Sequence, residues 1–303
     1  MEKRELGKTG LQVTPLGFGT AQIGFLDVPQ PDCDRLLNGL LDAGMNVVDT
    51  AACYGGAEEK IGKAISHRRE EYVLVSKCGH HVDEDDPPDW SPDIVRKSAE
   101  RSLKRLKTDF VDVMLIHSCG VEDLKNDALV RELVRCKEGG LVRSVGYSGD
   151  NESAQFALEM GVFECFETSL SVFDQQVLDT TLPKAAAEGL GVFLKRPIAN
   201  GCWRNMEGYG GGYENYVRPY VERFKAMNFT PQSIGFEGSW TDLALRFSAF
   251  QPGVSTAPIG GKNLEHLYED IEIVRKGPLP DEVVKAIRGI WRQHDDGSWK
   301  GQT

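Results

Sequence analysis

Short apolar runs rich in branched residues alternate with amphipathic stretches eight times along this chain of 303 residues. The apolar runs include residues 16, 47, 73, 113, 143, 164, 192 and 255. Regular alternation of strand and helix indicates a parallel sheet, and eight units of about 30–40 residues favour a closed barrel. An open doubly wound sheet is the alternative, but no Gly-x-Gly-x-x-Gly motif joins the first strand to its helix. We therefore predict an α/β fold, a (β/α)8 TIM barrel forming a single domain over residues 1–303, with an N-terminal β-hairpin over residues 3–14.

The charge balance argues against two classes of partner. The chain has 46 acidic and 35 basic residues and a formal net charge of −11, which disfavours binding to nucleic acid or to an anionic membrane. No apolar run reaches the roughly 18 residues needed to span a bilayer, and the first residues do not resemble a signal peptide. The seven cysteines are scattered without Cys-x-x-Cys spacing, as is typical of reduced thiols. These features predict a cytoplasmic protein that binds a small molecule, and they predict no particular oligomeric state.

Polar side chains end three successive apolar runs. Asp49 ends the run at residues 46–50 with Tyr54 just beyond it, and Lys77 and His117 end the next two runs. The C-terminal ends of barrel strands share one rim, so we expect these four side chains to meet there. A charged Lys77 would lower the pKa of the Tyr54 phenol from its ordinary value of about 10, while Asp49 would pair with Lys77. His117 could hydrogen-bond a carbonyl oxygen, which completes a predicted proton-transfer site.

Short motifs in a fixed order connect these residues to a known family. The motifs are Gly17-Phe18-Gly19-Thr20, Asp49-Thr50-Ala51 through Tyr54-Gly55, Val75-Ser76-Lys77, Leu115-Ile116-His117-Ser118 and Gly146-Tyr147-Ser148. With these motifs the chain resembles the aldo-keto reductase family over its whole length. The resemblance implies a barrel that binds a nicotinamide cofactor and reduces a small aldehyde, ketone or sugar carbonyl, or oxidises the corresponding alcohol. It also implies that Asp49, Tyr54, Lys77 and His117 are catalytic, with Tyr54 as the proton donor or acceptor.

The resemblance extends to cofactor positions, where several residues depart from the family's usual choice. Ser148 stands where the family hydrogen-bonds the carboxamide, but Gly149 replaces the usual Asn. Glu167 stands where Gln is common, and Ser171 where Asn is common. Lys195 occupies the position at which many members stack a tyrosine on the nicotinamide, so we expect the ring to pack differently here. The expected cofactor contacts are Gly19, Thr20, Asp49, Ser148, Gly149, Glu167, Lys195, Arg196, Pro197, Ile198, Gly260, Gly261, Lys262, Asn263, His266 and Asp270.

The stretch at residues 260–263 has the features of a phosphate site. Two glycines follow the eighth strand and precede a predicted helix, and phosphate sites in barrels lie after strands seven and eight. Lys262 could meet a ribose 2′-phosphate, whereas His266 replaces an arginine that many members carry. Arg196 is a suitable cation for the pyrophosphate. We therefore predict NADP as the cofactor, with NAD as the alternative.

Other reactive side chains in the sequence have simpler interpretations. His80 and His81 precede a run of acidic residues, but adjacent histidines rarely point at one ion, so we expect a solvated acidic loop and no metal. Cys53, Cys78 and Cys119 flank the predicted catalytic residues, and small buried thiols are the expected role for all three.

A Gly-rich and aromatic-rich stretch over about residues 201–216 interrupts the alternation. Its aromatic side chains, Trp203, Tyr209 and Tyr213, either cover the substrate or anchor a surface loop.

Two other functions are compatible with the residues. Lys77 could form a Schiff base in a barrel lyase, although pairing with Asp49 would keep it protonated. Alternatively, the barrel could be a cofactor-sensing subunit with little turnover.

Overall fold

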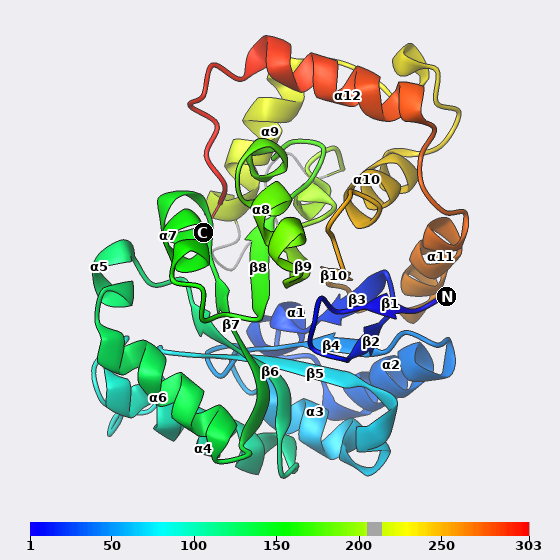
Figure 1. Cartoon of the computed structure of the whole chain (residues 1–303). Coiled ribbons are helices and arrows are strands. Elements are labelled where there is room, and N and C mark those ends of the chain that lie inside the picture. Colours follow the sequence, from blue (N-terminus) through cyan, green and yellow to red (C-terminus); the bar gives the residue numbers. More distant parts are fainter. Residues whose placement is uncertain (205–213, 303) are drawn as a thin grey trace.

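The computed structural model describes residues 1–204 and 214–302, and eight parallel strands form a barrel at its centre (Figure 1). The strands are β3 (Leu16–Gly19), β4 (Val47–Asp49), β5 (Val73–Cys78), β6 (Val111–His117), β7 (Val142–Ser148), β8 (Cys165–Ser169), β9 (Gly191–Lys195) and β10 (Ala257–Ile259). Hydrogen-bonded neighbours follow the order β10-β3-β4-β5-β6-β7-β8-β9. The backbone N–H of Leu194 donates to Thr256 O (3.0 Å), which joins β9 to the residue before β10 and closes the ring. The predicted (β/α)8 barrel is therefore confirmed.

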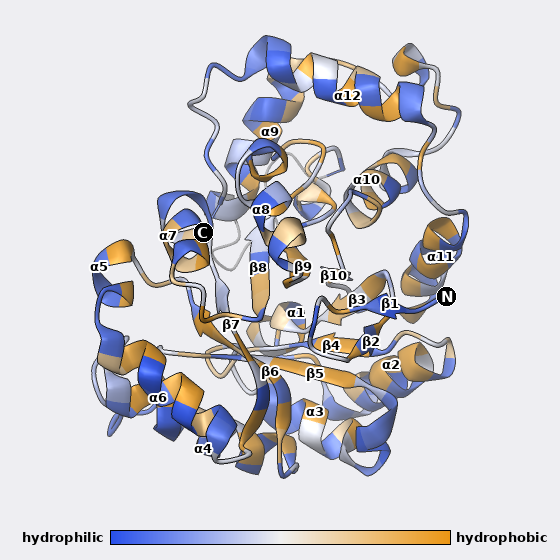
Figure 2. Cartoon of the chain, in the orientation of Figure 1, coloured by the Kyte–Doolittle hydropathy of each residue, from blue (hydrophilic) through white to orange (hydrophobic). Residues whose placement is uncertain are grey.

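Helices surround the barrel and cover its outer face (Figure 1). They are α1 (Ala21–Phe25), α2 (Gln30–Asp42), α3 (Ala57–Ile65), α4 (Pro92–Leu106), α5 (Val121–Leu124), α6 (Asp127–Glu138), α7 (Asn151–Glu159), α8 (Thr181–Glu188), α9 (Glu214–Met227), α10 (Trp240–Ala249), α11 (Leu264–Arg275) and α12 (Asp281–His294), with short 3-10 turns at Ser66–Glu71, Gln176–Asp179, Ala199–Gly201 and Gln232–Ile234. The strands are largely apolar, whereas the helices carry both apolar and polar residues (Figure 2). In α2, for example, Leu36, Leu37, Leu40 and Leu41 recur at helical spacing and are buried. Each such side chain contributes about 1.5–3 kcal/mol by leaving water.

The N-terminal hairpin fills one end of the barrel. β1 (Arg4–Glu5) pairs antiparallel with β2 (Gln12–Val13), as predicted. Leu6 and Val13 are fully buried and belong to one apolar cluster with interior side chains of the strands, including Phe193. Because this cluster occupies the N-terminal end, the functional groups are left to the opposite rim.

Two strands begin later than the sequence predicts. The apolar run that includes residue 164 forms β8 only from Cys165 to Ser169, and Phe163 before it packs against Tyr147 with ring centroids 6.2 Å apart. The apolar run that includes residue 255 forms β10 only from Ala257 to Ile259. Ser255 and Thr256 both donate their N–H groups to Val192 O (2.9 and 3.1 Å), so this stretch bonds toward β9 before β10 pairs with β3.

The C-terminal segment returns to the barrel after α12. It descends from α12 toward α7 and β8 (Figure 1). The backbone of Gly301 exchanges two hydrogen bonds with the Asn151 side chain (2.9 and 3.0 Å). Arg223 donates to Lys300 O (2.6 Å), and Trp299 packs on Trp291 with ring centroids 4.9 Å apart. The tail is therefore fixed to the same rim at which the strands end.

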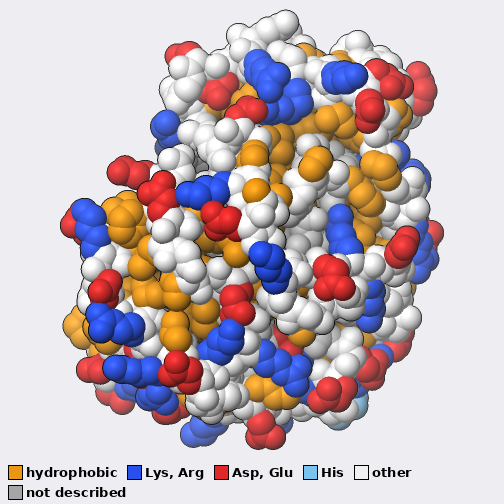
Figure 3. Space-filling view, in the orientation of Figure 1, with side chains coloured by type: hydrophobic (Ala, Val, Ile, Leu, Met, Phe, Trp, Pro, Cys, Tyr) orange, Lys and Arg blue, Asp and Glu red, His pale blue; other side chains and the backbone are white. Residues whose placement is uncertain are grey.

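The surface carries both signs of charge. On the face in Figure 3, Lys and Arg side chains are interspersed with Asp and Glu. Within the described ranges, every helix is too short or too polar to cross a bilayer. All seven cysteines are free thiols.

Candidate active site

Strand register places the polar strand ends side by side. Gly19 of β3 pairs with Asp49 of β4. His117 of β6 pairs with Ser148 of β7, which in turn pairs with Glu167 of β8. Residues far apart in sequence thus meet at the C-terminal rim, as expected for the fold.

Lys77 lies at the centre of this rim and is only 2% exposed. Its ammonium donates to Asp49 Oδ1 (2.6 Å) and to Thr50 O (3.0 Å). The Nζ atom lies 3.5 Å from Glu167 Oε1 and 5.2 Å from the centroid of the Tyr54 ring. The structure therefore brings the predicted acid, amine and phenol together and adds a second carboxylate, Glu167.

The charges of this cluster depend on one another. Burial raises the pKa of Asp49 to about 7, Glu167 adds to the rise, and Lys77 opposes it. Burial works against a charge on Lys77, but Asp49, Glu167 and Tyr54 outweigh it and hold the Lys77 pKa well above its ordinary value. Lys77 therefore remains an ammonium, which disfavours its use as an amine nucleophile.

The loop between β4 and α3 presents the Tyr54 side chain. Gly55 and Gly56 have φ of 32° and 77°, conformations that glycine adopts without strain. A Cβ on Gly24 of α1 would lie 1.9 Å from Tyr54 O, so only glycine lets α1 approach this loop. The Phe25 ring meets the Tyr54 ring edge-on, with centroids 5.5 Å apart. These backbone features fix where the phenol stands.

The acidity of Tyr54 differs from the sequence-based expectation. Lys77 does act to lower the pKa of the phenol, but burial is the larger effect and the pKa is raised. The prediction that the pKa of Tyr54 lies below its ordinary value is therefore wrong. A protonated Tyr54 at neutral pH is suited to donate a proton to an oxygen on which negative charge develops.

His117 completes the group and stands beside Tyr54. Their ring centroids are 6.0 Å apart, and Trp90 Nε1 donates to His117 O (3.0 Å), which anchors the backbone. Burial, followed by the charge of Lys77, lowers the pKa of His117 well below its ordinary value. The ring is thus a neutral imidazole, which carries one N–H donor and one acceptor nitrogen.

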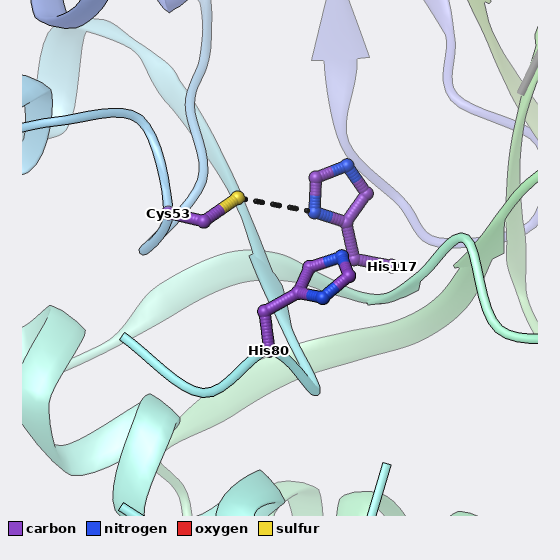
Figure 4. Close-up of side chains that lie close together, drawn as sticks. All are labelled: Cys53, His80 and His117. Carbon is purple, nitrogen blue, oxygen red and sulfur yellow. Dashed lines mark hydrogen bonds between the residues drawn. The ribbon is translucent and has the colours of Figure 1, made fainter. Parts of the chain in front are cut away.

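Cys53 does not follow the role predicted for it. Cys78 and Cys119 are buried as expected. Cys53 is only half-buried, and its Sγ lies 3.5 Å from Nδ1 of His117. Figure 4 shows both side chains together with His80, whose ring centroid is 4.9 Å from that of His117. The loop after β5 is also less solvated than predicted, because Asp86 is buried and paired with Arg101.

Ser148 and Glu167 form the next part of the rim. The Ser148 hydroxyl donates to Glu167 Oε2 (2.5 Å). A Cβ on Gly149 would lie 2.4 Å from the Tyr147 hydroxyl, which itself donates to Cys119 O (2.7 Å). The Tyr147 ring therefore accounts for glycine at the position where the family usually carries Asn.

Lys195 is held by a partner that the sequence reading did not single out. Its ammonium lies 2.8 Å from Asp150 Oδ2, and the same carboxylate accepts from Thr168 Oγ1 (2.8 Å) and from Ser169 N (2.7 Å). Burial opposes the charge on Asp150, yet Lys195, the Ser169 N–H and the charge of Arg196 together lower the pKa of Asp150. Two unusual features of the sequence could have indicated this ion pair. Asp150 follows the unusual Gly149, and Lys195 replaces a tyrosine.

Arg196 is engaged by the C-terminal tail. Its guanidinium donates to Ser169 Oγ (3.2 Å) and to Gln302 O, and it lies 5.0 Å from the centroid of the Tyr216 ring. The following residues turn away from the strand, with Pro197 O accepting from Ser248 Oγ (2.8 Å) and Ile198 half-buried. Sequence reasoning placed Arg196 at the rim but missed Gln302, which nothing in the local pattern indicates.

The predicted phosphate-binding stretch lies at the start of α11. β10 pairs with β3, and β3 pairs with β4, so this stretch is two strands from Asp49. Asn263 caps the helix, since its Oδ1 accepts from His266 N (3.0 Å). Lys262 and His266 are exposed. Burial raises the pKa of Asp270 to about 6, and Arg204 opposes the rise.

The residues at this rim suit an anionic dinucleotide with a carboxamide. Lys195, Arg196 and Lys262 supply cations, and the helix dipole at the N-terminus of α11 favours negative charge. Ser148 offers a hydroxyl, and the Glu167 carboxyl offers acceptor oxygens for an amide NH₂ group. Gly19 and Thr20 border the same rim, where the Thr20 hydroxyl donates to Asp49 O (3.0 Å). The donor set therefore fits the expected nicotinamide nucleotide.

The aromatic stretch after β9 is described only in part. Trp203 stacks on Trp240 with centroids 5.8 Å apart, which favours its role as a loop anchor. Tyr209 and Tyr213 lie outside the described residues.

Comparison with known proteins agrees with this geometry. Residues 15–292 match the sequence model of the Aldo/keto reductase family. The chain is 31% identical to the L-galactose dehydrogenase of Arabidopsis thaliana, over 90% of this chain and 88% of that protein. It is 27% identical to the NADH-specific methylglyoxal reductase of Escherichia coli, over 66% of this chain and 68% of that protein. The holo form of the aldo-keto reductase AKR11C1 from Bacillus halodurans superposes with a TM-score of 0.82 at 25% identity, covering 96% of each chain.

Proposed function

Because this chain belongs to the aldo/keto reductase family, we propose that it is an NADP-dependent oxidoreductase that reduces a small aldehyde, ketone or sugar carbonyl, or oxidises the corresponding alcohol. The observation that supports this most directly is the buried cluster at the barrel rim. There Lys77 Nζ lies 2.6 Å from Asp49 Oδ1 and 5.2 Å from the Tyr54 ring centroid. A carbonyl or sugar substrate also agrees with two relatives of the chain, which are named as an L-galactose dehydrogenase and a methylglyoxal reductase.

The proposed mechanism assigns one task to each residue. Tyr54 donates its proton to the substrate oxygen during reduction and takes it back in the reverse direction. Lys77 stabilises negative charge on the Tyr54 oxygen as the proton leaves, and Asp49 holds Lys77 in place through the 2.6 Å ion pair. Neutral His117 donates a hydrogen bond that orients the carbonyl oxygen. The bound nicotinamide supplies or accepts the hydride.

The proposed cofactor contacts follow the chemistry of the rim. Ser148 and Glu167 hold the carboxamide, Arg196 meets the pyrophosphate, and Lys262 meets a 2′-phosphate. The cation at residue 262 favours NADP. NAD remains the alternative, because His266 stands where many members of the family carry an arginine and one relative is named as NADH-specific.

Two alternatives predict different results in a turnover assay. A panel of small aldehydes, ketones and sugars is offered with NADPH and with NADH, and nucleotide oxidation is followed by absorbance. We expect turnover with at least one carbonyl. Tight nucleotide binding without turnover in either direction would instead favour a sensing subunit. Borohydride trapping of substrate on Lys77 would favour a Schiff-base lyase.

The choice of cofactor can be tested at Lys262. Lys262→Ala is expected to weaken NADPH binding at a cost on the order of 1.5–3 kcal/mol, because a charge-assisted contact to the 2′-phosphate is lost. NADH binding should change little, since NADH has no 2′-phosphate. Fluorescence titration with both nucleotides measures the effect. Lys285→Ala, an exposed lysine on α12, is the matched control. An equal loss for NADPH and NADH would remove Lys262 from the phosphate site.

A further inference from the structure

Cys53, His80 and His117 form a group of three metal-ligating side chains at the edge of the active site. Each offers one ligand atom, and these atoms all lie within 4.8 Å of one another. The side chains come from three different segments: the loop after β4, the loop after β5 and the end of β6. In Figure 4 they converge on one small space. We propose that this group binds one thiophilic divalent cation of the Zn²⁺ type and that the bound ion inhibits the enzyme.

The ligand separations suit such an ion. Bond lengths of about 2.3 Å to sulfur and 2.0–2.1 Å to nitrogen place tetrahedral S and N ligands about 3.5 Å apart. Cys53 Sγ and His117 Nδ1 are 3.5 Å apart, so these two ligands already have the required spacing. All separations among the three ligand atoms are within 4.8 Å, so a shift of His80 on the order of 1 Å brings them into this range. His80 is half-buried on a loop and follows Gly79, so a small rotation of its ring is feasible.

The ligand types narrow the choice of ion. One thiolate with two imidazoles suits Zn²⁺ and related cations better than Mg²⁺ or Ca²⁺, which prefer oxygen ligands. Binding converts the Cys53 thiol into a thiolate and releases its proton to solvent. Three protein ligands leave a fourth position for water, the arrangement seen in open zinc sites.

Neighbouring residues support His80 as a ligand. Asp89 Oδ2 lies 3.9 Å from His80 Nδ1, and we assign Nε2 as the ligand atom. A small rotation of the ring would bring the remaining N–H within hydrogen-bond reach of this carboxylate, as in many carboxylate–histidine–zinc sites. Trp90 packs edge-on against His80 (5.5 Å) and hydrogen-bonds the backbone of His117, so it links two of the ligands. The nearby charge of Lys77 is compensated by its ion pair with Asp49.

The structure also shows how the adjacent His80 and His81 side chains are arranged. The two side chains separate: His81 Nδ1 lies 3.1 Å from Asp86 O, whereas His80 packs against His117. The absence of a metal was predicted because adjacent histidines rarely share an ion. Here only His80 belongs to the group, and the other ligands come from elsewhere in the chain.

Inhibition follows because His117 has two competing tasks. An ion on Nδ1 fixes the ring and places a positive charge beside Tyr54 and Lys77. Substrate then meets an ion-bound water and an imidazole that can no longer turn to orient the carbonyl oxygen. This part of the inference rests on the proposed function, whereas ion binding does not.

Ion binding is tested with Co²⁺ as a spectroscopic probe and Zn²⁺ as its competitor. Wild-type protein should bind one equivalent of Co²⁺ with a thiolate-to-cobalt absorption band, which Zn²⁺ removes. Cys53→Ser and His80→Ala should weaken binding at least about tenfold. His81→Ala is the matched control and should bind as wild type does. Tyr54→Phe should also keep the band, which separates the ion site from the assignment of the proton donor.

Zn²⁺ inhibition is measured as the ratio of turnover with and without the ion. For the wild type, this ratio should fall as Zn²⁺ is added and recover when a chelator removes the ion. His80→Ala should need at least about tenfold more Zn²⁺ than the wild type to reach the same inhibition. A wild-type protein without the cobalt band, or an equal loss in His81→Ala and His80→Ala, would overturn the site. An occupied site with unchanged turnover would overturn the inhibition and leave the proposed carbonyl reduction in place.

Discussion

Tyr54→Phe is expected to lower turnover by about 10²–10⁴-fold, the range typical for loss of a general acid. The substitution keeps the ring that packs against Phe25 and His117 and removes only the hydroxyl. Folding and nucleotide affinity should therefore stay close to those of the wild type. Steady-state reduction of a carbonyl found in the panel gives the turnover, and fluorescence titration gives the affinity.

Tyr268→Phe is the control for Tyr54→Phe. Tyr268 is exposed on α11, and its hydroxyl lies 3.4 Å from Gly39 O, so its loss should leave turnover unchanged. Retention of more than about a tenth of wild-type turnover by Tyr54→Phe, when chemistry limits the rate, would mean that another group carries the proton. His117 would then be the first residue to examine.

Lys77→Met should reduce both turnover and stability. Turnover should fall steeply because the charge that stabilises a developing tyrosinate is gone. The double variant Tyr54→Phe/Lys77→Met should lose far less than the product of the two single losses, since both act on one proton. Two losses that multiply would show that Lys77 acts independently of Tyr54.

The stability loss in Lys77→Met has a defined pH dependence. Asp49 and Glu167 lose their shared cation, and breaking a buried pair costs about 3–5 kcal/mol. The pKa of Asp49 is already raised to about 7, and without Lys77 it should rise further. A carboxyl whose folded pKa exceeds its unfolded pKa binds more protons when folded, so stability falls as pH rises through this interval. The gap in melting temperature between wild type and variant should be larger at about pH 8 than at about pH 6. A gap that is the same at both values would exclude this explanation.

Part of the site could be predicted because it follows from strand periodicity. Asp49, Lys77 and His117 each stand at the end of an apolar run, and parallel strands bring their ends to one rim. Neither step requires knowledge of side-chain packing. The barrel itself was predictable for the same reason.

The parts that escaped prediction depend on contacts between distant segments. Glu167 reads as a substitution for glutamine, and only the structure shows it 3.5 Å from Lys77 Nζ. The rise in the pKa of Tyr54 requires the extent of burial, which no motif provides. Cys53 and His80 looked like a small buried thiol and a loop histidine until the fold placed both beside His117.

The placement of the C-terminal tail has a consequence for how the protein is made. β3 cannot pair with its neighbour β10 until that strand, which lies far downstream in the sequence, has been translated, and Arg196 binds Gln302 later still. At roughly 5–20 residues per second, on the order of ten seconds or more separate translation of the first barrel strand from that of its partner. During that interval the apolar edge of β3 is unpaired, so the ribosome-bound chain is a natural client for chaperones. The active site should therefore form only after β10 has been translated and has joined β3, and truncation before β10 should give aggregation and not a partially active enzyme.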